Sequence, residues 1–555
     1  AKFTRHGNWG GFSEVNCCVL MVAPKDALFK QIGKLFVEEV IQTYGTDHIY
    51  SCDTFNENRP TASAGEEGLD YLTESSEAVI KSMEAADHKA IWLMQGWLFM
   101  NDARFWQKAQ LDAYLKGVPH ERMILLDLFT DVFPVWKRKD LTRPTPIEKR
   151  RWVWNMLHSF GGNSGMYGRM HIISNDPIEA KKESHTMEGI GITTEGIEQN
   201  PAVYEMMAEM RWHHSPPSVA LWLEEWAHRR LGAHASEARV KLAQAAWREI
   251  GETVYSCPTT QMGQVKSMIE SRPRLDLYTG WIPNSDFMPI RRHYPETSLV
   301  NAWYKLIEAT LPSGADGYAP PACAMFDLVD VTRQVLSDTF ARLFVNIAGF
   351  VYVKTKQGVP LPTRDVRTVS QAEERMQLML GMIEDVDQLV GTQPHMLLGK
   401  WIAMARSWGS NDDDKALMEF NARNLVTLWG PRGEIADYAS KQWNGLIGDY
   451  YLPRWQLFFQ KIGSTLRDNR PLNQETFLAE LFQKENAWQT QTSPSFPALP
   501  LGDAMHLVHK LAQKYKEVIT NSLKDDIYSQ AIVSDVPVLH APGADVLTDQ
   551  LQGRS

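Results

Sequence analysis

The sequence lacks any cluster of basic residues. Its 555 residues carry 57 Lys and Arg against 67 Asp and Glu, a formal net charge of −10. General nucleic-acid binding needs a basic surface, so this balance argues against a nucleic-acid partner. No apolar run reaches about 18 residues, the length that a membrane-spanning helix requires, so we expect no membrane association. The chain starts at Ala1 without a signal peptide, and we expect any targeting segment to be missing from it.

Cysteine is also scarce. The five cysteines show neither a Cys-x-x-Cys pair nor a metal-type spacing, so the sequence predicts neither a disulfide framework nor a structural metal site. His213 and His214 are adjacent and would point apart on a helix, which argues against metal binding there. The sequence has no Asn-x-Ser/Thr acceptor for N-glycosylation.

What the chain does have, over residues 1–214, is a repeated alternation of strand and helix. Strands are expected at 48–50, 90–99, 122–129, 151–160 and 186–193, with a weaker candidate at 16–22. These runs are apolar on both faces, which indicates a parallel sheet covered by helices. A closed (β/α)8 barrel needs eight strands, so five or six fall short of one.

Beyond residue 214 the pattern changes to long segments with a helical period. Eleven such segments are expected between 217 and 522, among them 326–348 and 433–449. Residues 215–525 are therefore predicted to form an all-α domain, and 526–555 a loosely structured tail. The chain also contains 19 tryptophans, which suit a carbohydrate enzyme because indole faces stack on sugar rings, but which large helical cores use as well.

Two glutamates follow expected strands. Asn56 and Glu57 come soon after the run 48–50, and Glu195 follows the run 186–193. Because the carboxyl ends of parallel strands meet at one rim, we expect the two carboxyl groups to converge there. A glycosidase needs two such groups, one protonated and one ionised, with pKa values pushed apart by their surroundings. The pair therefore predicts a two-carboxylate glycosidase.

Other acidic residues compete for these roles. Glu188 lies early in its strand, where it would be too deep or face away, and Glu198 lies at an expected helix start, where it would serve as a cap. Asp127 and Asp131 are candidates for supporting carboxylates. His158 is either a pocket residue or a core histidine whose hydrogen bond is satisfied.

Several motifs of the chain, which occur in the same order as in the family, resemble those of the α-N-acetylglucosaminidases, glycoside hydrolase family 89. The resemblance runs from about residue 6 to about residue 520. In the first half it is carried by Cys52–Asn58, Trp92–Phe99, Leu125–Phe129, Met156–Asn163 and Glu195–Asn200. In the helical half it is carried by Leu428–Pro431 and the pair Asp437-Tyr438.

The resemblance implies a retaining exo-hydrolase that removes terminal α-linked N-acetylglucosamine from glycans of the heparan-sulfate type. It implies Glu57 as general acid/base and Glu195 as nucleophile, with no metal and no organic cofactor. The positions that match the family's pocket motifs are Asn56, Trp97, His158, Asn163, Trp429 and Tyr438.

The front of the chain departs from the family. Family members carry a small domain and the first barrel strands before the point where this sequence starts, so the resemblance implies a partial TIM-like barrel that lacks its first strands. A lysosomal, vacuolar or secreted location follows from the resemblance alone, and a homo-oligomer is left open. The alternative is a truncated, inactive paralogue that binds glycans or has no function.

Overall fold

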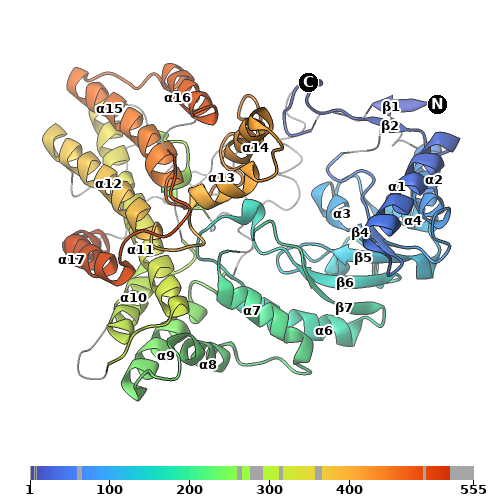
Figure 1. The fold of residues 1–555 in the computed structure, drawn as a ribbon, viewed down its shortest axis with the longest axis horizontal. Helices are drawn as coiled ribbons and strands as arrows, with labels where there is room; N and C mark the ends of the chain where they lie inside the picture. The colour runs from blue at the N-terminus through green and yellow to red at the C-terminus, as the bar shows by residue number, and fades with distance from the viewer. Residues whose placement is uncertain are drawn as a thin grey trace.

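The structure, a computed structural model, describes residues 2–5, 7, 9–58, 60, 65–196, 198–258, 266–275, 292–311, 317–356, 366–491 and 495–524. The tail expected at 526–555 lies outside these residues. Figure 1 shows two lobes, with the sheet and its helices α1–α4 on the right and a helical bundle on the left. The strand–helix alternation and the helical periodicity of the sequence therefore correspond to separate parts of the molecule.

A five-stranded parallel sheet forms the centre of the first lobe, in the order β3-β4-β5-β6-β7. Its strands are β3 (Ile49–Ser51), β4 (Ile91–Gln95), β5 (Met123–Asp127), β6 (Arg151–Met156) and β7 (Met187–Ile192). Strand order equals chain order, as in a (β/α) barrel, and β3 and β7 remain edges, so the predicted partial barrel is confirmed.

Two expected strands differ from the observed ones in pairing or in structure, and a third, 151–160, is four residues too long, because β6 ends at Met156. In the weak candidate 16–22 only β2 (Leu20–Val22) is extended, and it pairs antiparallel with β1 (Phe3–Arg5) outside the main sheet. The run 90–99 stops being extended at Gln95, because Trp97–Asn101 forms the short helix α3. A continuous apolar run does not separate a buried strand from a buried helix, which explains the second difference.

The helices of the first lobe lie between successive strands, except that α7 follows the last strand. They are α1 (Ala27–Tyr44), α2 (Gly65–Glu84), α3 (Trp97–Asn101), α4 (Lys108–Lys116), α5 (Met170–Ile173), α6 (Asp176–Glu183) and α7 (Pro201–Glu209). Asp26 caps α1 by accepting a hydrogen bond from the backbone N–H of Leu28. The face of α1 away from α2 leaves Ile32, Leu35 and Phe36 exposed.

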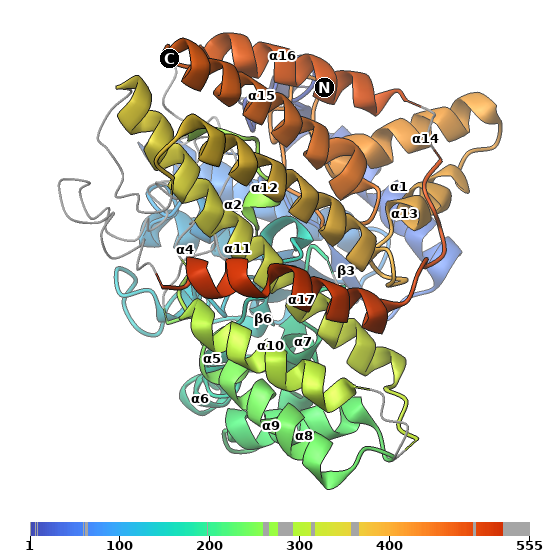
Figure 2. The ribbon, with the colours of Figure 1, turned by 90° about the vertical axis from the view of Figure 1, so that its left-hand side faces the viewer.

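The described residues of the second lobe form helices joined by loops and turns. Its helices are α8 (Val219–Leu231), α9 (Glu237–Glu252), α10 (Glu296–Thr310), α11 (Ala322–Thr355), α12 (Val369–Val390), α13 (Leu398–Arg406), α14 (Asp412–Leu425), α15 (Leu452–Asp468), α16 (Gln474–Gln489) and α17 (Ala504–Ser522). Figure 2 shows α11 behind α12 and α17, in the middle of the bundle.

Helix α11 is long and apolar enough to cross a membrane by length and composition, but 94% of its apolar window is buried inside the protein. It packs against α10, α12, α15 and α17. A helix that is apolar on every side is buried, and here the surrounding helices provide the burial.

The segment expected as a helix at 433–449 is mostly irregular. Gly433, Asp437 and Gly445 have φ values of 73°, 62° and 87°, a left-handed conformation that no helix interior accommodates. Helical structure resumes only at Ile447–Tyr451, a π-helical turn that leads into α15. This irregular segment is the part of the second lobe that reaches the sheet.

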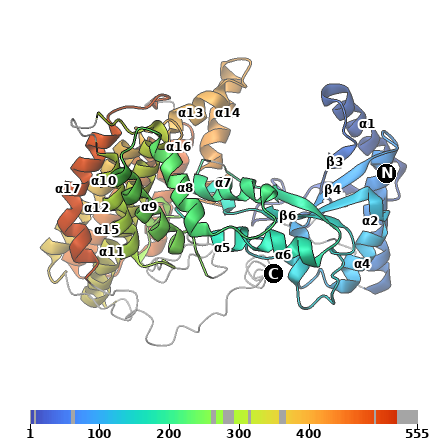
Figure 3. The ribbon, with the colours of Figure 1, turned by 90° about the horizontal axis from the view of Figure 1, so that it is seen from below.

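One buried apolar cluster includes residues of both lobes, from Tyr50 and Trp92 of the sheet to Trp455 and Tyr515 of the bundle. Figure 3 shows the two lobes side by side, with β6, α6 and α7 in the region between them. The carboxyl ends of β6 and β7 therefore lie close to the helical lobe.

Candidate active site

Glu57 lies in a tight turn that follows β3. The backbone N–H of Asn58 donates to the carbonyl of Phe55 at 2.7 Å, and the Phe55 ring is buried among Tyr71, Trp106 and Tyr114. This anchor fixes the turn, while the Glu57 side chain remains partly exposed.

Both carboxylate oxygens of Glu57 accept a hydrogen bond from an indole. Trp97 Nε1 donates to Oε1 at 2.9 Å, and Trp9 Nε1 donates to Oε2 at 2.5 Å. Trp97 is the first residue of α3, and Trp9 belongs to the N-terminal loop, where it stacks on Phe12 at 5.5 Å between ring centroids. Two neutral donors thus hold the orientation of Glu57.

Glu195 follows β7 and is held differently. Its Oε2 accepts from the backbone N–H of Gly161 at 2.6 Å and from the Tyr438 hydroxyl at 2.7 Å. Although the residue keeps exposed surface, desolvation by the surrounding protein raises the pKa of its carboxyl. The two hydrogen bonds oppose that rise, the charge of Glu57 adds to it, and the charge of Lys441 opposes it.

The Gly161 donor belongs to a turn with little room around it. Gly161 and Gly162 have φ values of 62° and 60°, which glycine adopts at no steric cost. A Cβ on Gly161 would clash with the carbonyl oxygen of Tyr438, and one on Gly162 would lie 2.6 Å from the Cα of Gly196. The turn is therefore packed between the helical lobe and the loop that carries Glu195.

The helical lobe contributes two aromatic side chains. Trp429 and Tyr438 meet edge to face with 5.1 Å between ring centroids, and Tyr438 lies beside Phe160. Phe160 in turn packs edge to face on Trp97 at 5.5 Å. Rings from both lobes thus form a continuous line from the partners of Glu57 to those of Glu195.

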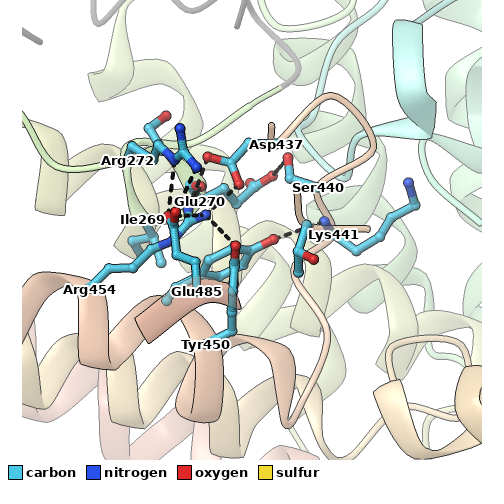
Figure 4. A network of polar contacts seen from close by, with 12 residues as sticks. Ile269, Glu270, Arg272, Asp437, Ser440, Lys441, Tyr450, Arg454 and Glu485 are labelled. Carbon is cyan, nitrogen blue, oxygen red and sulfur yellow. Dashed lines mark hydrogen bonds and ion pairs between the residues drawn. The ribbon is translucent and has the colours of Figure 1, made fainter. Parts of the chain in front are cut away.

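A buried charged network anchors the segment that carries Tyr438 (Figure 4). Arg454 of α15 donates to both carboxylate oxygens of Asp437, at 2.8 and 3.0 Å, and pairs with Glu485 at 2.8 Å. Glu485 also accepts two hydrogen bonds from Arg272. A buried charge is stable only when it is paired and hydrogen-bonded, so each member depends on the others.

Comparison with protein families gives two matches that together span most of the chain. Residues 1–214 match the α-N-acetylglucosaminidase TIM-barrel domain, and residues 222–514 match the α-N-acetylglucosaminidase C-terminal domain. The chain belongs to the α-N-acetylglucosaminidase family.

Individual relatives agree with this. Human alpha-N-acetylglucosaminidase is 34% identical over 516 residues, which cover 92% of this chain and 64% of the human protein. The family 89 glycoside hydrolase from Clostridium perfringens in complex with 2-acetamido-1,2-dideoxynojirmycin has a TM-score of 0.76 at 24% identity, over 92% of this chain and 54% of that one. The same hydrolase in complex with its substrate GlcNAc-alpha-1,4-galactose has a TM-score of 0.77 at 24% identity, over 93% and 55%. The chain thus spans somewhat more than half the length of the relatives it matches.

The structure brings together five of the eight residues that the family resemblance singles out. Glu57, Trp97, Glu195, Trp429 and Tyr438 are linked by the hydrogen bonds and ring contacts given above. Asn56, with φ at 43°, is exposed beside Glu57 in the same turn.

His158 and Asn163 lie behind this candidate site rather than at its surface. His158 is buried, and its Nε2 accepts from Asn200 Nδ2 at 2.9 Å. Burial lowers its pKa to about 3, so the ring is neutral. Asn163 Nδ2 donates to the carbonyls of Tyr438 and Ser440, which ties the sheet lobe to the helical lobe. Their observed contacts are structural.

The rival carboxylates have other partners. Glu188 is exposed and pairs with Arg151 at 2.8 Å, and Glu198 lies near His395 at 3.3 Å and Lys400 at 3.7 Å. Asp127 and Asp131 are fully buried and accept hydrogen bonds from backbone N–H groups beyond their strands, which shapes the loops there. Burial raises the pKa of each to about 7.

Two residues of the site were not singled out from the sequence. Trp9 lies in a glycine-rich loop without periodic signal, and Lys441 follows Tyr438 in the segment expected as a helix. In the sequence, Trp9 is distinguished only as a single tryptophan among glycines, with Gly7 before it and Gly10 and Gly11 after it. Among the described residues, no group of three or more His, Cys, Asp or Glu side chains is arranged to hold a metal ion.

Proposed function

We propose that this chain provides the catalytic glutamates of a retaining exo-α-N-acetylglucosaminidase. The observation that carries the proposal is the pairing of Glu57 and Glu195. They follow different strands of one sheet, yet the ring of Phe160 joins Trp97, which donates to Glu57, to Tyr438, which donates to Glu195. Two carboxyl groups at one site are what a two-step glycosidase requires.

In the first step, an ionised oxygen of Glu195 attacks the anomeric carbon of the terminal sugar. A bond forms between that oxygen and the carbon while the glycosidic bond breaks, and Glu57 gives its proton to the departing oxygen. In the second step, Glu57 takes a proton from water, the water oxygen bonds to the anomeric carbon, and the bond to Glu195 breaks. Two inversions restore the original configuration.

The surroundings of each glutamate support its role. Gly161, Tyr438 and Lys441 favour the ionised form of Glu195 against the desolvation that opposes it. The two indole donors hold the orientation of the Glu57 carboxyl. Trp429 and Tyr438, which are both half-buried, offer apolar faces for a sugar ring.

The substrate class rests on relatives. The human relative is named for α-N-acetylglucosaminidase activity, and the Clostridium structure contains GlcNAc-alpha-1,4-galactose in a variant with glutamine in place of two glutamates. We extend the proposal to glycans with a terminal α-linked N-acetylglucosamine, of the heparan-sulfate type. A lysosomal, vacuolar or secreted location belongs to the same proposal.

The test is hydrolysis of p-nitrophenyl α-N-acetylglucosaminide by this chain and by a longer form that includes the upstream coding sequence. We expect Glu195→Ala to remove the activity, Glu57→Ala to lower it by slowing the second step, which needs the base, and the first product observed by NMR to be the α-anomer. Unchanged hydrolysis in both variants would refute the assignment of the glutamates, and an initial β-anomer would refute retention.

A second candidate is a glycan-binding protein without hydrolysis. The open edge of β3 and the exposed apolar face of α1 favour it, because an unclosed barrel holds a substrate less completely. Calorimetric binding of GlcNAc-α-1,4-galactose without turnover, in both the chain and its longer form, would support this candidate over the enzyme.

A further inference from the structure

Gly161 connects the proposed nucleophile to the helical lobe in two directions. Its N–H donates to Glu195 Oε2 at 2.6 Å, and its carbonyl accepts a hydrogen bond from Lys441 Nζ. The lysine ammonium also donates to the carbonyl of Ala439 at 3.0 Å. The Lys441 side chain thus links its own segment to the Gly161–Gly162 turn, whose N–H group binds the proposed nucleophile.

Lys441 belongs to the same segment as Tyr438, which donates directly to Glu195. The segment is fixed at several points. Asp437 is paired with Arg454, Ser440 Oγ donates to Glu270 at 2.7 Å, and the backbone N–H of Lys441 donates to the Tyr451 hydroxyl at 3.3 Å. Figure 4 shows the Lys441 side chain extending away from this network. One rigid segment therefore reaches the nucleophile twice.

We propose that Lys441 is a positioning residue for the nucleophile: it holds the Gly161–Gly162 turn against Glu195 and presents a cation beside that carboxylate. The inference rests on the proposed role of Glu195. The lysine does not touch the reacting atoms, and it acts through the backbone of Gly161 and through its charge.

Charges around Lys441 are consistent with this role. Desolvation lowers its pKa to about 8, Glu270, Glu195 and Glu198 raise it, and Lys266 lowers it. In return, the charge of Lys441 lowers the pKa of Glu195, against the opposite effect of Glu57. The ammonium remains protonated at acidic pH, where a glycosidase of this type needs an ionised nucleophile.

Three substitutions separate the hydrogen bond from the charge. Lys441→Met removes both, Lys441→Gln keeps an amide donor without charge, and Lys441→Arg keeps donor and charge. Lys461→Met is the matched control, because Lys461 is similarly half-buried and pairs with Glu480 at 2.7 Å, between α15 and α16. Circular dichroism and thermal unfolding establish that each variant is folded.

The first measurement does not depend on activity. In protein labelled with 13C at the glutamate carboxyls, the Glu195 resonance is assigned by its loss in Glu195→Gln and titrated with pH. We expect the pKa of Glu195 to rise in Lys441→Met and Lys441→Gln, and to stay at its wild-type value in Lys441→Arg and Lys461→Met. An unchanged Glu195 pKa in both uncharged variants would refute the proposal.

The second measurement is the pH dependence of kcat/KM. Its acid limb reports ionisation of the nucleophile in the free enzyme, so the limb should move to higher pH in the uncharged variants. At a pH below the limb, kcat/KM should fall on the order of tenfold for each pH unit by which the limb moves. A lower kcat with an unmoved limb would mean a purely structural role and would refute the proposal. A shifted Glu195 pKa in a protein without hydrolysis would instead refute the proposed function and leave the role of Lys441 supported.

Discussion

The two glutamates of the site occupy contrasting environments. Glu57 is held by Trp9 and Trp97, two neutral donors from the N-terminal loop and a short helix of the sheet lobe. Glu195 is held by Gly161 and Tyr438, with the cation of Lys441 nearby. The same residue type at two strand ends thus receives different neighbours, and the proposed function uses this difference to separate an acid from a nucleophile.

The supports behind the two glutamates differ as well. On the Glu195 side, Asp437, Arg454 and Glu485 form a buried network inside the helical bundle. On the Glu57 side, β3 is an edge strand and α1 exposes Leu35 and Phe36. The difference indicates that the geometry of Glu195 depends on the packing of the helical lobe, whereas that of Glu57 depends on loops and rings.

The largest expected effects are losses of kcat in Glu57→Ala and Glu195→Ala. How each loss depends on the leaving group of the substrate distinguishes the roles of the two glutamates. With a poor leaving group such as a disaccharide, Glu57→Ala should lose about 10²- to 10⁴-fold in kcat, the usual contribution of a general acid. With a 2,4-dinitrophenyl leaving group that needs no proton, the first step should be nearly unaffected. Glu195→Ala should remove turnover with both substrates. Equal losses for the two variants with both substrates would contradict the assignment of separate roles.

A smaller but still large effect is expected in the charged network. Arg454→Met leaves Asp437 and Glu485 buried with one cation fewer, and breaking a buried pair in this way costs about 3–5 kcal/mol. The measurement is the free energy of unfolding in urea. Arg151→Met, which breaks the exposed pair with Glu188, is the matched control and should cost less than about 1 kcal/mol. Similar losses in the two variants would mean that the network does not support the segment.

Much of this arrangement could be predicted from the sequence. The strands apolar on both faces, the shortfall against eight strands and the helical second lobe all follow from periodicity, and the structure agrees. The two glutamates could be paired because parallel strands bring their carboxyl ends to one rim. Both features depend on local pattern and on the rules of parallel sheets.

The contributions of the helical lobe could not be derived in that way. Tyr438 is separated from Glu195 by 243 positions and lies in an irregular segment that periodicity predicted to be helical. Trp9 reaches Glu57 from a loop 48 positions upstream. Such contacts depend on tertiary packing, which local pattern does not contain. The family resemblance supplied Tyr438, but Trp9 and Lys441 were found only in the structure.

The hydroxyl of Tyr438 should have an intermediate effect. Tyr438→Phe keeps the ring contact with Trp429 but removes a donor to the Glu195 carboxylate, and a hydrogen bond to a charged group contributes about 1.5–3 kcal/mol, or roughly 10- to 100-fold in kcat/KM. Because that donor lowers the pKa of Glu195, its loss should also move the acid limb to higher pH. Tyr515→Phe on α17, which removes a hydrogen bond to Asp385 of α12, should leave both unchanged. An unmoved acid limb in Tyr438→Phe would argue against this contact.

The smallest expected effect lies on the open side of the sheet lobe. Leu35 is 58% exposed on α1, so Leu35→Ala should change the free energy of unfolding by less than about 0.5 kcal/mol, as at most exposed positions. Val37, on the same helix, is 4% exposed, and Val37→Ala should cost about 1.5 kcal/mol for the two carbons it removes. Urea unfolding of the two variants side by side makes the comparison. If Leu35→Ala costs more than Val37→Ala, the apolar face of α1 is covered in solution. The contrast between an open Glu57 side and a closed Glu195 side then no longer holds.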